Sequence, residues 1–312
     1  MPNPPDLTVV ICSHNRSQLL RQALVALARC ARPPQASMEV LVVANNCSDD
    51  TLQVLESFVV SEDWSDLPLR WVEESRPGKS NALNRAIADT HASTLCFLDD
   101  DQFVAPSFLQ EIMNALRTNP DVDIFCGTLH PAWDGSEPAW VHVEGPYRIP
   151  VRPFPEYDLG NAEREITLQD KLPSGGNIVV RRRVFASAGA FNTHLGPRGH
   201  DLGGAEDLDF LLRCQAKGHR IRYVPAIRQL HAIESERMAT SYMLRKSYQR
   251  TLSSRLAHSG AQHGIRPYMV VKPVGHALRA IFTADSSRRF YFLMRLSAAL
   301  GELKAAIASR SK

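Results

Sequence analysis

The sequence predicts an α/β protein whose central sheet is mainly parallel and flanked by helices, followed by a helical C-terminal extension. Short apolar runs alternate with segments of helical periodicity through the first 130 residues. Strands joined by helices through short connections form parallel, doubly wound sheets. Beyond about residue 236 the chain reads as helical. With 312 residues, 44% of them hydrophobic, it can form one large domain with such an appendage.

The apolar runs place the elements in order. Five runs predict strands, at 7–12, 40–43, 69–72, 94–98 and 122–126. Apolar residues three and four apart predict the intervening helices, at about 19–27, 49–59, 80–90 and 108–116. An irregular stretch, 130–173, follows; order returns with a strand at 178–180, a helix, a glycine-rich loop at 196–204, another helix and a strand at 221–224. We therefore expect a domain over 1–235 and an extension over 236–312, with breaks near 260–267 and 284–287.

The cysteines and the N-terminus favour a reduced, cytosolic protein. The six cysteines form no CxxC pair, which argues against a disulfide framework or a structural zinc site. Residues 1–6 lack a signal pattern, and no run reaches the roughly 18–20 apolar residues of a transmembrane helix. We expect at most a peripheral contact with the inner face of a membrane.

Charge is distributed unevenly along the chain. Residues 243–312 hold 13 Lys and Arg against two acids, a net charge of +11, although the whole chain carries only +3. A basic tail suggests an anionic partner. Nucleic acid is one such partner, but apolar segments at 268–271, 280–282 and 290–294 fit an anionic membrane surface better. The alternative is a solvated helical face that packs on the body.

Three consecutive aspartates, Asp99, Asp100 and Asp101, close the apolar run 94–98. Adjacent carboxylates at the end of a buried strand are costly unless a cation or a ligand compensates them. The carboxyl ends of parallel strands are also where ligands bind in open α/β sheets. A divalent cation bridging carboxylates and phosphate oxygens would give the cluster a role. An acidic, solvated turn is the alternative interpretation.

Polar clusters also follow the first three strands. They contain Ser13, His14 and Arg16, then Asn45, and then Arg76 and Lys79. Strand–turn–helix junctions expose N–H groups that attract phosphate, and the cations suit a diphosphate. Singly, each cluster could be only caps and turns. A P-loop is excluded, because Glu73 occupies the position of its first glycine.

Glu206 and Asp207 open a predicted helix directly after the glycines of the 196–204 loop. Carboxylates in a first helical turn are favoured by the helix dipole, so a purely structural role is one interpretation. The functional interpretation is a general base at the rim of the crevice.

Four segments together resemble the family 2 glycosyltransferases, which are inverting enzymes of the GT-A fold that use nucleotide-diphospho-sugars. The segments are VVICSHNR at 9–16, VVANNCSDDT at 42–51, FLDDD at 97–101 and GAED at 204–207. The resemblance covers about residues 7–231 and depends on their order, spacing and strand context. It implies a nucleotide-binding half over 1–128 and an acceptor-binding half over 129–235.

The resemblance implies a role for each matching residue. Those expected at the nucleotide or donor sugar are Ser13, His14, Arg16, Asn45, Arg76, Lys79, Asp99 and Asp100. Asp101 is expected as the main ligand of Mn²⁺ or Mg²⁺ in a DxD motif, with His231 as a further metal or diphosphate contact; a structural His231 is an equal alternative. Asp207 matches the catalytic base, and Gly176, Asn177 and Glu206 are expected at the acceptor and sugar pocket.

One position departs from the family pattern. Many relatives carry an acid at the position of Ala44, where it recognises uracil. Alanine cannot make that bond, although Asn45 or Asn46 could substitute. We expect a UDP-sugar donor, with GDP- and dTDP-sugars as open alternatives.

The implied function is transfer of a sugar to an acceptor hydroxyl, in surface-polysaccharide or glycolipid synthesis and without nucleic acid. A soluble small-molecule acceptor is one alternative. A nucleotidyltransferase is another, but it would more often carry a glycine-rich loop where Ser13–Arg16 stands. A catalytically silent binding module is the third, and the retained Asp101 and Asp207 argue against it.

Overall fold

The computed structural model describes residues 4–197, 206–257 and 266–308. The chain divides into two compact units. The sheet unit comprises residues 1–132 and 155–232, and the helical unit comprises residues 133–154 and 233–312. Each unit has a hydrophobic core of its own.

The sheet unit is built on nine strands in one sheet, in the order β3-β2-β1-β4-β8-β6-β9-β5, with β7 also paired to β9. The strands are β1 (Leu7–Ser13), β2 (Met38–Asn45), β3 (Leu69–Glu74), β4 (Thr94–Asp99), β5 (Gln102–Val104), β6 (Ile124–Pro131), β7 (Arg164–Ile166), β8 (Asn177–Arg181) and β9 (Ile221–His231). The first four strands pair in parallel. The α/β architecture expected from strand–helix alternation is therefore confirmed.

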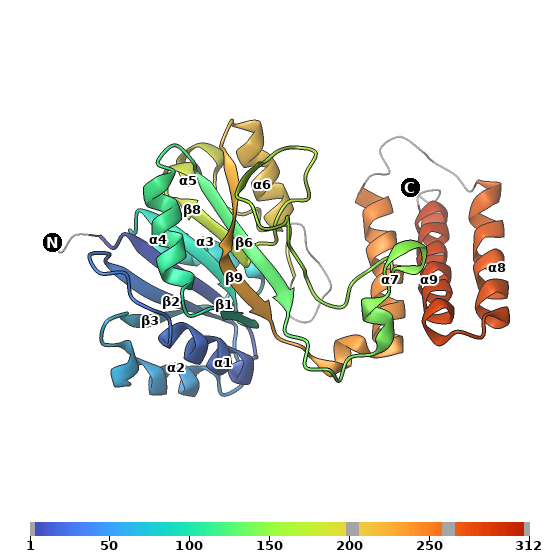
Figure 1. Cartoon of the computed structure of the whole chain (residues 1–312), viewed down its shortest axis with the longest axis horizontal. Coiled ribbons are helices and arrows are strands. Elements are labelled where there is room, and N and C mark those ends of the chain that lie inside the picture. Colours follow the sequence, from blue (N-terminus) through green and yellow to red (C-terminus); the bar gives the residue numbers. More distant parts are fainter. Residues whose placement is uncertain (1–3, 198–205, 258–265, 309–312) are drawn as a thin grey trace. The chain divides into compact units, whose positions relative to one another are not determined.

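Helices cover both faces of this sheet (Figure 1). They are α1 (Ser17–Ala28), α2 (Thr51–Val59), α3 (Lys79–Asp89), α4 (Phe108–Thr118), α5 (Arg183–Ala188) and α6 (Glu206–Ala216), with the 3₁₀ turn η1 (Glu62–Trp64). Side chains of α1, α2 and α4 pack into one core, and those of α3, α5 and α6 pack into the other. Successive strand residues alternate between these cores, as with Val9 and Val10, because side chains of a strand point to opposite faces.

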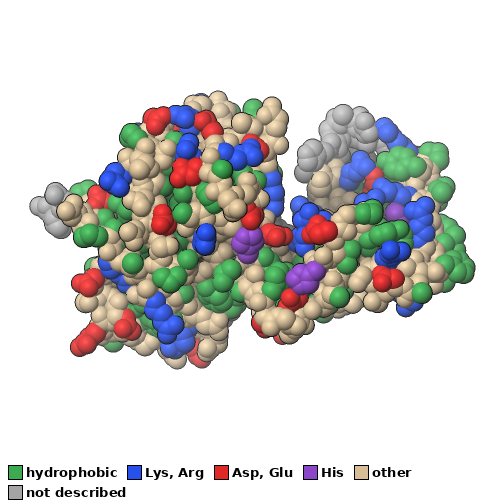
Figure 2. All heavy atoms as spheres, viewed as in Figure 1, with side chains coloured by type: hydrophobic (Ala, Val, Ile, Leu, Met, Phe, Trp, Pro, Cys, Tyr) green, Lys and Arg blue, Asp and Glu red, His purple; other side chains and the backbone are tan. Residues whose placement is uncertain are grey.

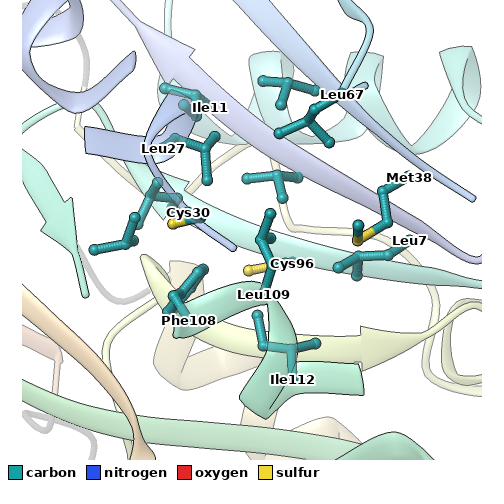
Figure 3. Close-up of a cluster of buried hydrophobic side chains, with 14 of the residues drawn as sticks. Leu7, Ile11, Leu27, Cys30, Met38, Leu67, Cys96, Phe108, Leu109 and Ile112 are labelled. Atoms are coloured by element: carbon teal, nitrogen blue, oxygen red, sulfur yellow. The ribbon is translucent and has the colours of Figure 1, made fainter. Parts of the chain in front are cut away.

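The first of these cores is shown in Figure 3. Leucines of α1 and the aromatic and aliphatic side chains of α4 meet the inward-facing residues of β1, β2 and β4. Phe108 and Leu109 are fully buried at the start of α4. These residues also include the thiols of Cys30 and Cys96, and all six cysteines of the chain are free. Burial raises the pKa of both thiols above the ordinary range, so they act as small apolar groups.

The second half of the sheet differs from a simple parallel series. β8 runs antiparallel between β4 and β6, so the expected strand at 122–126 is not a direct neighbour of β4. Two short strands, β5 and β7, were not predicted, because three residues are too few for a periodicity to show. Both pair antiparallel with β9.

The pairing brings the polar clusters to one edge. In the register of the parallel strands, Cys12 lies beside Asp99, and Asn45 lies beside Glu74. Because β8 runs the opposite way, it is its first residue, Asn177, that lies beside Leu98 near the end of β4. The edge therefore combines the ends of four parallel strands with the beginning of an antiparallel one.

The helical unit is dominated by three long helices, α7 (Thr240–Ala257), α8 (Pro267–Phe282) and α9 (Ser286–Ala308). Short 3₁₀ turns η2 (Ala139–His142), η3 (Gly145–Tyr147) and η4 (Ser235–Met238) accompany them. α9 packs against both α7 and α8. Its Phe290 packs against Trp140 with the two rings tilted and their centroids 4.5 Å apart, in a core completed by Met243 and Met294. Among the described helices, none combines the length and apolar character needed to cross a membrane.

Candidate active site

The three aspartates at the end of β4 lie in a network of cations and hydroxyls. Asp100 and Asp101 are each only 4% exposed. Ser13, at the end of β1, donates a hydrogen bond to Asp100 over 2.7 Å. Arg16 Nη1 lies 2.8 Å from Asp100 Oδ1 and 2.9 Å from Asp101 Oδ2. Because Arg16 precedes α1 directly after β1, the adjacency of β1 and β4 brings these groups together.

Lys79, at the start of α3, forms an ion pair with Asp99. Burial acts to lower the pKa of Lys79, but the carboxylates of Asp99, Glu206 and Asp207 outweigh it and raise the pKa. The ammonium is therefore charged. At Asp100, in contrast, burial has the largest influence and raises the pKa of the carboxyl group, while the charge of Arg16 lowers it. The edge thus holds carboxylates that need cationic neutralisation.

His231, at the end of β9, faces the same aspartate cluster. Its Nδ1 lies 2.7 Å from the carbonyl oxygen of Ala232, and its Nε2 lies 3.3 Å from Asp101 Oδ2. In the tautomer with its proton on Nδ1, the ring donates to this carbonyl, and Nε2 carries the lone pair that a metal ion requires. Asp101 and His231 are the residues that would hold a metal ion here, and a backbone carbonyl on the other ring nitrogen is the usual arrangement of a metal-binding histidine.

The donor set fits an ion that also takes substrate oxygens. Across the described part of the chain, no three His, Cys, Asp or Glu side chains form a preformed metal cage. Mg²⁺ is commonly held by one or two carboxylates together with substrate phosphates, rather than by an all-protein cage. Asp101 and His231 suit a site of this kind.

The loop after β3 is held in place by Asn45. Its Nδ2 donates to the carbonyl oxygens of Glu74 and Arg76, at 2.9 and 2.7 Å, and its Oδ1 accepts from Gly78 N at 2.9 Å. His14 Nδ1 in turn lies 2.7 Å from the carbonyl oxygen of Asn45. Asn45 thus joins β2 to the residues that lead into Lys79.

Arg76 lies at the surface of this loop. Its guanidinium pairs with both carboxylate oxygens of Glu74, at 2.9 and 2.8 Å. Hydrogen bonding from Arg76 lowers the pKa of Glu74. Glu74 was not among the expected site residues, although an acid at the end of a strand, two residues before an arginine, is a signal that could have found it.

Two consecutive glycines separate the aspartate cluster from the expected base. Gly175 N donates to Asp207 Oδ2 over 2.9 Å, while Asp207 Oδ1 accepts from Leu208 N over 2.7 Å. A β-carbon on Gly176 would lie 2.5 Å from Asp99 Cγ, and one on Gly175 would lie 3.2 Å from Asp207 Cβ. The glycines therefore allow the backbone to pass directly between two carboxylates.

Glu206 lies beside Asp207 in the first turn of α6 and is only 5% exposed. Burial raises its pKa, and the charge of Lys79 opposes that rise. The expected glycine-rich loop precedes it. Its first residues lie against α3, where Lys79 N donates to the carbonyl oxygen of Pro197 over 3.1 Å. From residue 198 onward, including Gly203 and Gly204, that loop lies outside the described residues.

Asn177 lies inside the sheet and is 1% exposed. Its Nδ2 donates to the carbonyl oxygen of Gly127 over 2.8 Å, and its Oδ1 accepts from Gly127 N and Gln229 Nε2, both over 3.0 Å. The side chain thus fixes β8 against β6 and β9. Gln102, which was not singled out from the sequence, supports Asp99 in a similar way by accepting from its N–H over 3.2 Å.

The structure therefore brings most of the expected residues to one edge. The direct contacts join Ser13, Arg16, Asp100, Asp101 and His231 in one group. Lys79 and Asp99 form a second group, which Gly176 adjoins. Asp207 adjoins the second group through Gly175.

Solved structures with the same fold are glycosyltransferases. A mannosyltransferase, PcManGT from Pyrobaculum calidifontis, in complex with GDP-Man and Mn²⁺, superposes with a TM-score of 0.57 at 17% identity, over 97% of this chain and 88% of that one. TarS of S. aureus, residues 1–349 in complex with UDP, gives a TM-score of 0.55 at 14% identity, over 98% and 91%. At these identities the likeness concerns the fold, which is GT-A.

Relatives in sequence point the same way. A probable glycosyltransferase, YdaM of Bacillus subtilis, is 23% identical over 71% of this chain, which spans about half (49%) of that relative's length. Glucosyl-dolichyl phosphate glucuronosyltransferase of Haloferax volcanii is 21% identical over 80% of this chain and 76% of its own length.

A family model confirms the relationship over the part of the site that lies before residue 189. The model described as glycosyl transferase family 2 matches residues 8–188, more than half of the chain. The matched region contains the aspartate cluster, Arg16, Lys79 and the two glycines. The chain therefore belongs to glycosyl transferase family 2.

Proposed function

We propose that this chain moves a sugar from a nucleotide-diphospho-sugar to an acceptor hydroxyl with inversion at the anomeric carbon. The observation that carries the proposal is the pair Gly175–Gly176, which lies between Asp207 on one side and Asp99 on the other. The proposed base and the proposed donor-binding carboxylate are thus separated by only the thickness of a glycine backbone. A reaction between a donor and a hydroxyl needs both groups at one place.

The donor is proposed to bind along the ends of β1, β3 and β4. Arg16 and Lys79 neutralise the aspartates, and the same cations would meet a diphosphate. Ser13, His14, Asp99 and Asp100 would orient the ribose and the sugar. Asn45 would act through the loop that it holds, and Arg76 would extend the positive surface.

Asp101 and His231 are proposed to hold Mn²⁺ or Mg²⁺, which, when bound, supplies positive charge to the departing diphosphate. The position of Nε2 against Asp101 Oδ2 supports this assignment. Removing the metal with EDTA, or introducing Asp101→Asn, should weaken nucleoside-diphosphate binding at least about tenfold, because the diphosphate would lose the positive charge of the metal ion. Calorimetric titration with UDP and GDP would measure this; equal affinity with and without metal would refute the site.

Asp207 is proposed as the general base. Two backbone N–H groups fix its carboxylate, so the oxygens keep a constant orientation toward the acceptor. It would take the proton of the acceptor hydroxyl as that oxygen attacks the anomeric carbon from the face opposite the diphosphate. Gly176 and Glu206 would line the acceptor side, while the buried Asn177 would support that wall from within the sheet.

The test is Asp207→Asn, which keeps the side-chain shape and removes the basic oxygen. Transfer should fall by about 10²–10⁴-fold, while nucleotide affinity stays near that of the unchanged protein. Asp209→Asn, in the same helix but paired with Arg213, is the matched control and should transfer normally. A fully active Asp207→Asn variant would exclude this residue as the base.

The donor is proposed to be a UDP-sugar, with GDP- and dTDP-sugars as alternatives. Ala44 is buried and lacks the acid expected for uracil recognition. Solved proteins of this fold bind either base: PcManGT is described with GDP-Man, and TarS with UDP. Mass spectrometry of slow donor hydrolysis across a panel of nucleotide-sugars would identify the donor.

The acceptor is proposed to be a glycan or a lipid-linked sugar, met at the cytoplasmic face of a membrane. The relatives support this choice: one is named for glucosyl-dolichyl phosphate, and another is a succinoglycan biosynthesis protein, ExoM of Rhizobium meliloti. The excess of basic residues after residue 243 also favours an anionic surface. Product analysis with membrane extracts and with soluble sugars would separate the two acceptor classes.

A further inference from the structure

We propose that the outer face of α8 docks on an anionic membrane surface. Helix α8 is apolar on two sides. Met269, Pro273, His276 and Ala280 form its buried side, which faces α9, since His276 stacks on Phe292 of that helix with centroids 6.5 Å apart. A helix that is apolar all round is normally covered all round.

The other side of α8 is exposed. Val271, Ile281 and Phe282 are 69%, 70% and 82% exposed, and Val270, Val274 and Leu278 are half exposed or more. With Tyr268, α8 supplies seven of the fifteen exposed large hydrophobic residues of the described chain, which identifies it as the place where apolar surface concentrates. At about 100° per residue, the six aliphatic and aromatic side chains from Val270 to Phe282 span an arc of about 120°. Figure 2 shows hydrophobic side chains (green) along the edge formed by α8.

The charges around the exposed face of α8 indicate what binds there. The exposed Arg279 lies on the same helix as the apolar arc, the exposed Arg266 directly precedes that helix, and the sequence from 266 to 284 contains no acid. Beyond it, Asp285 caps α9 by accepting from Arg288 N, and Glu302 is buried. A second copy of the same face would bring cations against cations. An anionic lipid surface instead accepts both the apolar arc and these basic residues.

The ends of the face fit the same occupant. Tyr268 begins the arc and Phe282 ends it, and aromatic side chains are favoured at the boundary between headgroups and acyl chains. A helix of 16 residues with these properties would lie in the plane of the interface. This inference extends the proposed lipid-linked acceptor and rests on that proposal only for its biological purpose; binding itself is measured without donor, acceptor or turnover.

The test is flotation of the full chain with vesicles of phosphatidylcholine alone or mixed with phosphatidylglycerol. The purified protein should float with the mixed vesicles and not with the neutral ones. The variant Val274→Gln/Ile281→Gln should lower the partition coefficient at least about tenfold, because each substitution removes an apolar side chain from the interface. The matched control, Val60→Gln/Leu300→Gln, changes two exposed apolar residues outside α8 and should bind normally.

Circular dichroism and sedimentation in the absence of lipid accompany both variants. The proposal is overturned if the unchanged protein ignores anionic vesicles, or if a folded α8 variant floats as well as the control. It is also overturned if the only effect of the α8 variant is to convert a dimer to a monomer. If the unchanged protein floats with anionic vesicles but transfers no sugar, this inference stands and the proposed catalytic function is wrong.

A second inference rests on a separate feature, a pocket of about 380 Å³ within the helical unit. Its charged lining consists of Arg250, Arg255, Lys272 and Arg295 with a single acid, Glu302. Glu302 is 4% exposed and already pairs with Arg255 and, over 3.0 Å, with Lys272. Within the described residues, no carboxylate forms an ion pair with Arg250 or Arg295.

The excess positive charge lowers the pKa of two neighbouring basic groups. Burial lowers the pKa of Lys246, and Arg237 and Arg250 lower it further. Burial likewise lowers the pKa of His276, with Arg295, Arg279 and Lys272 adding to the effect. From the cation cluster and the volume we infer that this pocket binds a phosphate or diphosphate group, carried by a soluble molecule or by a lipid headgroup.

Titration with inorganic pyrophosphate in EDTA, which suppresses the metal-dependent donor site, tests the soluble source. Flotation with phosphatidate vesicles tests the lipid source. The variant Arg250→Gln/Arg295→Gln should weaken at least one of these interactions about tenfold or more. Arg288→Gln/Arg289→Gln, which removes equal charge outside the pocket, should not. Equal effects of both variants, or no binding in either arm by the unchanged protein, would overturn the site.

Discussion

Asn45 and Asn177 use their side-chain amides to hold the protein backbone, although both stood among the residues expected to touch substrate. Their positions at strand ends were visible in the sequence, because polar residues that follow apolar runs mark the edge of a parallel sheet. Where an amide directs its hydrogen bonds depends on strands that are distant in sequence, such as the pairing of Asn177 with Gly127. Sequence reasoning could therefore place these residues at one edge of the sheet, but it could not show which of them support the backbone.

The supporting role of Asn177 can be tested by Asn177→Ala. The substitution leaves the N–H and carbonyl of Gly127 buried without these partners, which should lower the free energy of unfolding by about 2–4 kcal/mol. Urea denaturation would measure the loss, with exposed Asn114→Ala as the control that stays near the original value. A variant of undiminished stability that shows only a raised acceptor KM would instead favour direct contact with the acceptor.

At the scale of elements, helical glycines decide how closely the helices of the helical unit approach. A β-carbon on Gly301 of α9 would lie 2.4 Å from the carbonyl oxygen of Tyr248 in α7, whereas one on Gly275 of α8 would meet nothing within 4 Å. Gly301 thus permits a close backbone contact, and Gly275 does not serve that purpose.

The two glycines give a matched pair of substitutions. Gly301→Ala should destabilise the helical unit by about 1–3 kcal/mol, because α7 and α9 must move apart. Gly275→Ala should stabilise it by about 0.5–1 kcal/mol through helix propensity. Thermal denaturation of both variants measures the difference. Equal effects would mean that α7 and α9 do not pack as closely as described.

Lys246 of α7 should give this unit a pH dependence. Its Nζ donates to the carbonyl oxygen of Pro153 over 2.9 Å, and burial with nearby Arg237 and Arg250 lowers its pKa to about 8. An unfolded lysine has a pKa of about 10.4, so between these values the unfolded chain binds more protons and stability should rise with pH. Lys246→Met should remove this rise between about pH 8 and 10, while the exposed Lys304→Met should keep it.

At the scale of the whole molecule, alternation in the sequence predicted the parallel half and the helical C-terminal region. It could not show that β8 enters between β4 and β6, since pairing partners leave no trace in local periodicity. Nor did the sequence indicate that residues 133–154 join the helical unit. That stretch has little periodicity, and its attachment depends on contacts such as Trp140 with Phe290.

Because the sheet unit and the helical unit have separate hydrophobic cores, we expect them to unfold at different temperatures. Calorimetry should resolve two transitions, and UDP or GDP with Mn²⁺ should raise only the one that belongs to the sheet unit. At a ligand concentration of 100 times Kd the stabilisation would be about 2.7 kcal/mol. Gly301→Ala should lower the other transition alone. A single transition that shifts in both experiments would mean that the two cores unfold as one cooperative system.

The insertion of β8 also constrains how a nascent chain can mature. Cys96 pairs with Val179, so a ribosome must add more than 80 residues after β4 before its second edge is covered. Until then an apolar strand presents unsatisfied backbone groups, the kind of edge that recruits chaperones or neighbouring chains. A fragment truncated at residue 128 would keep that edge permanently and should accumulate in inclusion bodies.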